Sequence, residues 1–259
     1  MQEIIRVSDV EKYYGNGDQV TKAVDRVSFA VQQGEFIGVM GASGSGKTTL
    51  LNLLSTIDRV TAGHIYYGDT DITELGEEQL SEFRKKQLGF IFQEYNLLDT
   101  LTLEENIMLV MTLHRRGKKE IQKRCRELLR ILGIEEVKDK YPYQVSGGQK
   151  QRLCIARALL KKPKVLIFDD STSAVDTATE GKIRTALSKL QGVTKIIIAQ
   201  RITSVMDADL IVILEDGKIH AAGTHRQLLA EDPIYQEIYA SQMKGDEHHA
   251  GPSAQRQKA

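Results

Sequence analysis

The sequence predicts an α/β fold in which helices wrap a mostly parallel sheet. Short apolar runs at residues 36–40, 165–168, 195–199 and 210–214 have the composition of buried parallel strands. Segments with helical apolar spacing separate these runs, and such alternation is typical of parallel sheets covered by helices. The first run leads directly into a glycine-rich segment and then a helix, which places a tight turn at the end of a strand.

Two further strands are expected before that first run. Residues 4–10 and 24–31 have strand character, and the second segment alternates apolar and small residues with a period of two. The stretch YYGNGDQ (13–19) between them is rich in turn residues. The sequence therefore predicts a small antiparallel β region near the N-terminus.

The helix after the glycine-rich segment is expected to cover residues 47–57. Between about 95 and 160 the chain is expected to form a helical subdomain, with helices at 104–113, 118–132 and 147–160. Another helix is expected at 180–190, with its apolar face toward the core. The polar residues 244–259 predict a disordered tail, so the folded domain is expected to span residues 1–243.

Composition excludes several classes of protein. The 259 residues carry 35 Lys and Arg and 35 Asp and Glu, so a net charge of zero gives no electrostatic reason to expect a nucleic-acid partner. The two cysteines, Cys125 and Cys154, are too far apart for a CxxC zinc motif and too few for a disulfide scaffold. No apolar run approaches the roughly 18 residues that span a bilayer. Any role at a membrane is therefore expected to require a partner chain.

The glycine-rich segment, GASGSGKT (41–48), matches the phosphate-binding pattern G-x-x-x-x-G-K-[ST]. Gly41, Gly44 and Gly46 allow a tight backbone whose N–H groups converge on phosphate oxygens. The following helix directs its positive end at the same anion. Lys47 is expected to reach the β- and γ-phosphates and the Thr48 hydroxyl to bind Mg²⁺. The sequence therefore predicts ATP and Mg²⁺ as ligands.

A second Mg²⁺ element is expected at the end of a later strand. The apolar run VLIF is followed by Asp169, whose carboxylate can hold a water on the ion opposite Thr48. An apolar run that ends in Asp is weak evidence by itself. When the run follows a phosphate loop by about 120 residues, it is more specific evidence for a Mg²⁺ site.

The segment VSGGQKQR (145–152) resembles the signature motif of ABC-type ATPases, with Val145 where Leu is usual. Together with GASGSGKT, Gln93, Asp169 and Asp176 in the same order, it makes nearly the whole chain similar to an ABC nucleotide-binding subunit. The resemblance implies an α/β P-loop NTPase core with a helical subdomain. It also implies a transport-coupled ATPase that acts at the inner face of the cell membrane.

The resemblance also implies roles for individual residues. Tyr14 would stack on adenine, although Tyr13 is an alternative, and Gln93 would lie near Mg²⁺ and the attacking water. Asp176 would link two sites across a dimer interface. The loop that contacts the phosphates would consist of Gly41, Ala42, Ser43, Gly44, Ser45, Gly46, Lys47, Thr48 and Thr49. The residues that bind the γ-phosphate of an opposite subunit would be Ser146, Gly147, Gly148 and Gln149.

Because these signature glycines open a helix, a second helix N-terminus would face the same phosphate. ATP would then join two chains head to tail, in a homodimer or a heterodimer. Opening of the dimer after hydrolysis would be passed to transmembrane subunits near residues 93–100. The rival interpretation is an isolated ATP-gated dimerisation module with little turnover.

The resemblance divides along the chain. Residues 50–58 and 83–107 are similar to ATPase subunits of lipoprotein-release and bacitracin-type transporters. Residues 168–180, 196–205 and 207–219 are similar to the degenerate-site nucleotide-binding domain of heterodimeric exporters. A chimaera, a consensus or otherwise engineered sequence, and an unusual natural branch would each explain this mixture.

Two catalytic positions depart from the family pattern. Asp170 stands where Glu normally orients the attacking water, and its carboxylate is one methylene shorter. Gln200 stands where a histidine is usual, and Gln donates an N–H but carries no positive charge. Both changes predict intact ATP binding with slow hydrolysis, since a misplacement of about 1 Å can lower a rate on the order of 100-fold. The alternative is that both are neutral variants in a competent enzyme.

Overall fold

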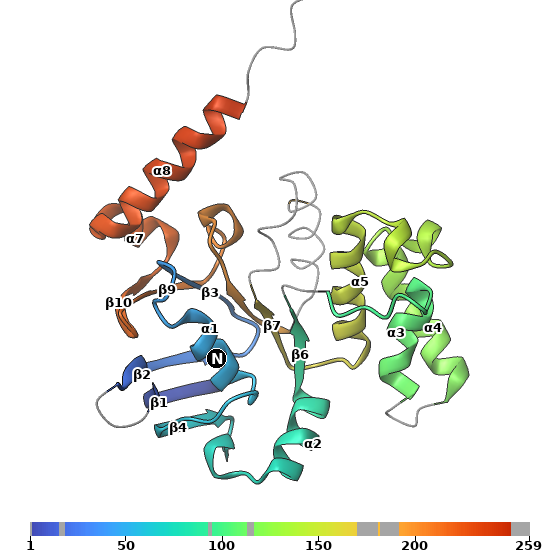
Figure 1. Cartoon of the computed structure of the whole chain (residues 1–259), viewed down its shortest axis with the longest axis horizontal. Helices are drawn as coiled ribbons and strands as arrows, with labels where there is room; N and C mark the ends of the chain where they lie inside the picture. The colour runs from blue at the N-terminus through green and yellow to red at the C-terminus, as the bar shows by residue number, and fades with distance from the viewer. Residues whose placement is uncertain are drawn as a thin grey trace, which may run out of the picture.

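The computed structural model describes residues 2–15, 19–92, 95–112, 117–169, 181 and 192–249. In these residues the chain forms two sheets with helices between and beside them (Figure 1). The larger sheet has the strand order β10-β9-β3-β8-β7-β6, and every neighbouring pair is parallel except β9 and β10. Its strands are β3 (Phe36–Gly41), β6 (Leu88–Ile91), β7 (Val165–Asp169), β8 (Thr194–Ile198), β9 (Leu210–Glu215) and β10 (Lys218–Gly223). The four apolar runs of the sequence are its central strands.

The smaller sheet is antiparallel and has the order β2-β1-β4-β5. Its strands are β1 (Glu3–Tyr14), β2 (Thr21–Gln32), β4 (Ala62–Tyr67) and β5 (Thr70–Asp71). Along β2, Val27 and Val31 are buried with Phe29 half-buried between them, as the alternating pattern predicts. This sheet is the antiparallel β region expected near the N-terminus.

The helices form three sets: an N-terminal set near the smaller sheet, a helical group beside β6, and a C-terminal set. The first set comprises α1 (Lys47–Leu54), η1 (Ile72–Glu74) and α2 (Glu77–Gln87). The helical group comprises α3 (Leu103–Thr112), α4 (Lys118–Ile131), η2 (Glu135–Val137), η3 (Pro142–Gln144) and α5 (Gly147–Leu160). The C-terminal set comprises η4 (Ile202–Ser204), α7 (His225–Glu231) and α8 (Pro233–His249).

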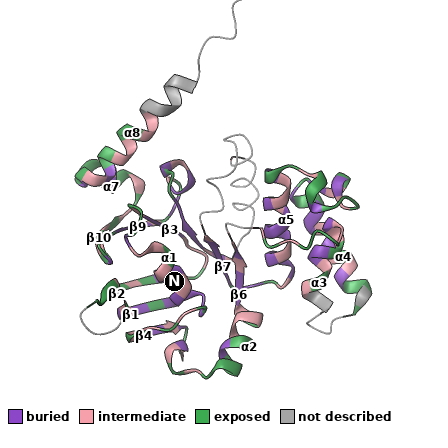
Figure 2. Ribbon diagram, viewed as in Figure 1, coloured by how far each residue is buried: buried purple, intermediate pink, exposed green. Residues whose placement is uncertain are grey.

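Two apolar cores hold these layers together, and buried residues run along the central strands and the inner faces of the helices (Figure 2). One core joins the smaller sheet, α1 and one face of the larger sheet. The other joins the opposite face of the larger sheet to α3, α4, α5 and the start of α8. The central strands β3, β7, β8 and β9 are covered on both faces, which explains their continuous apolar runs.

Several elements differ from the sequence expectations. Helix α1 ends at Leu54 and not at residue 57, because Thr56 has a left-handed φ of 59° and the Ile57 N–H bonds to the Asn52 carbonyl. Tyr13 and Tyr14 belong to β1 and not to a turn. Helix α8 continues to His249, so residues 244–249 are helical where a disordered tail was expected. The helix expected at 180–190 lies outside the described residues, apart from residue 181.

Several short or polar elements are not predicted from the sequence. These are β4, β5, α2, β10, α7 and α8. Most of them expose many side chains, so they lack the apolar periodicity that marks the central strands. Among the described residues, no helix has the length and apolar character needed to cross a bilayer.

Candidate functional site

The glycine-rich segment forms the turn between β3 and α1. Gly41 and Gly46 have φ values of 147° and 97°, in the region that favours glycine. A Cβ on Gly46 would lie 2.1 Å from the Ala23 carbonyl oxygen, and one on Gly41 would lie 2.2 Å from the Leu214 carbonyl oxygen. Both glycines therefore allow the loop to pass close to neighbouring backbone, and α1 begins at Lys47 with Gly46 as its N-cap.

The site lies where three parallel strands end side by side. In the register of the larger sheet, Val39 pairs with Ile198 and Ile198 pairs with Asp169. The chain leaves β3 into the glycine loop, β8 toward Gln200 and β7 directly after Asp169. Open parallel sheets bind ligands at the carboxyl ends of their strands, so this edge is the expected place for a ligand.

A cavity of about 520 Å³ opens at this edge. It brings together residues from both sheets and from α1: Thr21, Lys22, Ala23, Gly41, Ser43, Gly44, Gly46, Lys47, Thr48, Thr49, Asp169, Ile198 and Gln200. Most of the predicted loop residues, with Asp169 and Gln200, therefore line one space. Thr21, Lys22 and Ala23 are not predicted from the sequence as site residues, because only the packing of the smaller sheet brings the start of β2 to the cavity.

Lys47 lies over the loop that precedes it. Its ammonium donates hydrogen bonds to the carbonyl oxygens of Gly41 at 2.9 Å and Ala42 at 2.6 Å. Within the loop, the Ser45 N–H donates to the Ala42 carbonyl, and the Gly217 N–H donates to the Ser45 carbonyl. The loop is thus tied to the β9–β10 turn, and the lysine charge is held at the cavity.

Asp169 and Thr48 provide a donor set that suits Mg²⁺. Burial raises the pKa of the Asp169 carboxyl above its usual value, and a bound cation would stabilise the ionised form. The exposed Thr48 lines the same cavity and offers a hydroxyl oxygen. Carboxylate and hydroxyl oxygens are the ligands that Mg²⁺ prefers, so these residues fit the ion.

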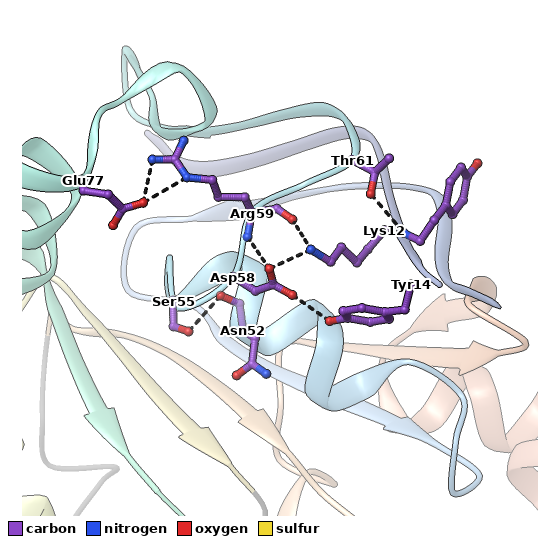
Figure 3. A network of polar contacts seen from close by, with 9 residues as sticks. Lys12, Tyr14, Asn52, Ser55, Asp58, Arg59, Thr61 and Glu77 are labelled. Atoms are coloured by element: carbon purple, nitrogen blue, oxygen red, sulfur yellow. Dashed lines mark hydrogen bonds and ion pairs between the residues drawn. The ribbon is translucent and has the colours of Figure 1, made fainter. Parts of the chain in front are cut away.

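Tyr14 is held beside α1 by the polar network of Figure 3. Its hydroxyl donates to Asp58 Oδ2 at 2.7 Å, and Asp58 Oδ1 lies 2.7 Å from the Lys12 ammonium. That ammonium also lies over the Tyr14 ring, 5.0 Å from its centroid. Tyr14 is 43 % exposed and does not belong to the lining of the cavity. The structure therefore gives Tyr14 a fixed orientation and an exposed surface.

The signature segment forms the start of α5. Ser146 is the N-cap: its hydroxyl accepts from the Gln149 N–H, and its own N–H donates to Gln149 Oε1. Ser146 and Gly147 are exposed, whereas Gly148 is buried. None of these residues lines the described cavity of their own chain. The structure thus presents the signature at the surface, apart from the phosphate loop.

Three predicted site residues cannot be placed. Gln93, Asp170 and Asp176 lie outside the described residues. The strands before the first two are described: β6 ends at Ile91 and β7 at Asp169. Their side chains therefore remain sequence predictions.

The fold and the cavity define a class of protein. A glycine loop that caps a helix at the carboxyl ends of parallel strands, with a lysine inside the loop and an aspartate on a neighbouring strand, is a P-loop nucleotide-binding domain.

Comparison with known proteins identifies the family. Residues 24–173 match the family model described as ABC transporter, and the chain belongs to that family. The bacitracin export ATP-binding protein BceA of Halalkalibacterium halodurans is 40% identical over 240 residues, which cover 88% of this chain and 93% of that protein. The ABC transporter ATP-binding protein YxdL of Bacillus subtilis is 38% identical, covering 89% of this chain and 92% of that protein. The chain is thus an ATP-binding subunit of an ABC transporter, a class of ATPases.

A solved structure supports the same assignment. The ATP-binding cassette MJ0796, described as a dimer in a post-hydrolysis state bound to ADP and Pi, matches with a TM-score of 0.80 and 33% identity. The match covers 86% of this chain and 99% of that chain. The expected α/β P-loop fold of the ABC type is therefore confirmed.

The comparisons do not support the mixed origin that the sequence analysis considered. The bacitracin-export relative aligns over 88% of the chain, so its likeness extends well beyond the segments first assigned to that type. No separate source for the C-terminal third is needed to explain the similarity. The expectation of a chimaera with a degenerate-site exporter domain is not retained.

Proposed function

We propose that this chain binds Mg-ATP, hydrolyses it slowly in its own site and pairs head to tail with a second ABC subunit. The dimer would act on transmembrane transporter subunits at the inner face of the cell membrane. The observation that carries the proposal is that Lys47, Asp169 and Gln200 line one cavity while Ser146 and Gly147 lie exposed outside it. A site built this way needs a second chain to bring a signature helix to its phosphate.

Each residue has a physical task in this proposal. The Lys47 ammonium and the loop N–H groups neutralise and orient the phosphates, and Thr48 and Asp169 would hold Mg²⁺ with Gln93. When bound, Mg²⁺ neutralises charge on the phosphate oxygens. Gln200 donates an N–H toward the γ-phosphate, and Asp170 holds the attacking water in line with the bond that breaks. As the water oxygen forms a bond to the γ-phosphorus, its proton would pass to Asp170, and the bond from that phosphorus to the β-phosphate oxygen would break to leave ADP and phosphate.

Slow hydrolysis follows from these two side chains. The Asp170 carboxylate is one methylene shorter than the usual Glu, so the water is held farther from the phosphorus. Gln200 keeps a donor but lacks a positive charge, and one good donor to a developing oxyanion is worth roughly 3 kcal/mol. ATP binding depends on other groups and would remain strong, which would make the ATP-closed dimer long-lived.

Adenine is assigned to the exposed face of Tyr14. Lys12 lies over the ring, so a base can stack on the face that Lys12 leaves uncovered. The hydrogen bond to Asp58 fixes the ring before the nucleotide arrives, which lowers the entropic cost of stacking. Tyr13 is a weaker candidate, because its side chain is only half-exposed whereas Tyr14 is exposed.

The test combines phosphate release with size-exclusion chromatography, with and without Mg-ATP. We expect Mg-ATP to convert the chain to a dimer, alone or with a partner subunit, and Asp170→Glu and Gln200→His to raise turnover by roughly 10- to 100-fold each. Asp139→Glu is the matched control, since Asp139 is an exposed residue of the helical group. Slow hydrolysis is excluded if the wild type turns over at rates typical of the family and Asp170→Glu changes nothing.

An assay with a transmembrane subunit distinguishes the transport function from the rival function. Stimulation of turnover by such a subunit, or co-purification with it, supports the transporter role. Dimerisation on ATP without either result would instead identify an isolated ATP-gated dimerisation module.

A further inference from the structure

Gln242, in the second half of α8, bonds to the loop that follows β8. Its side-chain Nε2 donates to the Gln200 carbonyl oxygen at 2.8 Å, and its Oε1 accepts from the Ile202 N–H at 2.8 Å. We propose that Gln242 is a positioning residue that holds Gln200 at the phosphate cavity, so that the C-terminal helix sets the rate of hydrolysis. This inference rests on the role of Gln200 in the proposed function.

Helix α8 is anchored firmly enough to provide this support. Tyr235 is fully buried, and Ile238 and Tyr239 pack against the same core. Gln242 follows at the spacing i, i+3, i+4 and i+7, so it continues the docked face of the helix. An apolar residue at position 242 would extend this apolar face, but the residue there is Gln242, which has a side-chain amide.

The two ends of this amide match the two backbone groups of the loop. After the Ala199 N–H donates to the Val39 carbonyl, the chain leaves the sheet, and the next residue is Gln200. The Gln242 amide accepts from one residue of the departing loop and donates to another, which fixes the position of the loop and not only its distance from α8. Gln200, in this loop, lines the cavity.

The physical consequence concerns the rate and not the affinity. The phosphates would be bound mainly by the Lys47 loop, whereas the hydrogen bonds of the Gln242 side chain go to Gln200 and Ile202. Release of the Gln200 backbone would let its amide move away from the γ-phosphate. Small displacements of a catalytic group lower the rate of the chemical step much more than they weaken substrate binding.

Helix α8 supplies a matched control. Gln236 lies in the same helix, and its side-chain amide donates to the Leu229 carbonyl of α7 at 3.0 Å, away from the cavity. Gln236→Ala therefore removes an amide contact of α8 without touching the loop that carries Gln200. Gln242→Glu is a conservative variant, because it keeps an oxygen that can accept from the Ile202 N–H but loses the donor to Gln200.

The experiment measures kcat, KM and the Kd of ATP for Gln242→Ala, Gln242→Glu, Gln236→Ala and Gln200→Ala in the full chain. Amide hydrogen exchange of residues 199–205 is followed in the same proteins. We expect both Gln242 variants to lower kcat on the order of 10-fold with the Kd of ATP unchanged. Exchange at the Ile202 amide should rise in Gln242→Ala, whereas Gln236→Ala should match the wild type in every measurement.

Three outcomes would overturn the inference, and they differ in what else they overturn. If Gln200→Ala lowers kcat and the Gln242 variants do not, only the role of Gln242 is lost. If Gln236→Ala lowers kcat as much as Gln242→Ala, α8 acts through general docking and not through this amide. If Gln200→Ala leaves kcat unchanged, the proposed role of Gln200 is lost together with that of Gln242.

Discussion

Arg157 of helix α5 donates a hydrogen bond to the carbonyl oxygen of Asn96 at 2.6 Å. Its other terminal nitrogen donates to the Tyr95 carbonyl at 3.0 Å, and the Cys154 thiol donates to the same oxygen at 3.2 Å. Asn96 has a left-handed φ of 47°, so the backbone turns sharply where it is held. The signature helix is thereby joined to the segment that follows Gln93.

Arg157→Ala should therefore loosen residues 95–98 and lower the free energy of unfolding by roughly 1–3 kcal/mol, since two carbonyls lose a charged donor. Hydrogen exchange of these residues, with urea unfolding, checks both effects. Arg152→Ala is the matched control, because Arg152 lies in the same helix but donates to the carbonyls of Leu132 and Gly133. Equal exchange of 95–98 in both variants would contradict the prediction.

The glycines of the phosphate loop should differ in their tolerance of alanine. Gly44 and Gly46 both have positive φ, which costs a side-chain-bearing residue about 1–2 kcal/mol. A Cβ on Gly44 meets nothing within 4 Å, whereas one on Gly46 would lie 2.1 Å from the Ala23 carbonyl oxygen. Gly46→Ala should therefore lower the free energy of unfolding by clearly more than Gly44→Ala. Thermal unfolding of both variants checks the order, and similar midpoints would contradict it.

The Tyr14 ring should contribute to nucleotide affinity through stacking. Tyr14→Ala is expected to weaken ATP binding by about 1–3 kcal/mol, the usual contribution of one base on an aromatic ring. Binding of inorganic tripolyphosphate, which has no base, should not change. Calorimetric titration with both ligands checks this, with Tyr13→Ala as the control. A larger loss of ATP affinity in Tyr13→Ala would assign the base to Tyr13 instead.

Asp58 should make stability depend on pH in the acid range. Partial burial raises its pKa, but hydrogen bonds from Lys12, Tyr14 and the Arg59 N–H outweigh that effect and bring the pKa below its usual value. A lowered pKa in the folded state stabilises the protein above the unfolded value of about 3.9, and the gain is lost as pH falls through the folded pKa.

Asp58→Asn should accordingly lower the free energy of unfolding by about 1 kcal/mol at pH 7, because the charged pair with Lys12 is lost. The difference from wild type should begin to shrink near pH 4 and vanish once pH lies below the folded pKa of Asp58. Urea unfolding across this range checks it, with the exposed Asp139→Asn as control. A difference that does not depend on pH would show that the Asp58 charge is not responsible.

The two cysteines should react only when the protein unfolds. Both are buried, and burial raises the pKa of Cys125 to about 12 and that of Cys154 to about 11. At pH 8 almost no thiolate is present in the folded state, and the thiolate is the reactive form. Labelling with a thiol reagent in native buffer and in urea checks the prediction. Rapid labelling of either cysteine in native buffer would contradict it.

The central strands and the phosphate loop could be predicted from the sequence because their signals are local. Residues 36–40 and 165–168 are apolar on both faces, and they became β3 and β7. Gly46 and Lys47 belong to the phosphate-loop pattern. In it the glycine is needed for its backbone conformation and the lysine for its charge. Helix α2, in which only Leu80 is buried, has no such local pattern, and it forms because neighbouring chain segments pack against it.

The sequence by itself determined the chemistry of the site: a lysine and glycine loop for phosphates, Asp169 for a cation, and Gln200 in place of a histidine. Only the tertiary structure decided which distant residues share that site. Strand register brings Asp169 beside Ile198, packing of the smaller sheet brings Lys22 to the cavity, and the docking of α8 brings Gln242 to the Gln200 loop. The amino-acid sequence states which residue type stands at each position. Contacts between segments far apart in the chain depend instead on how their apolar faces are buried together.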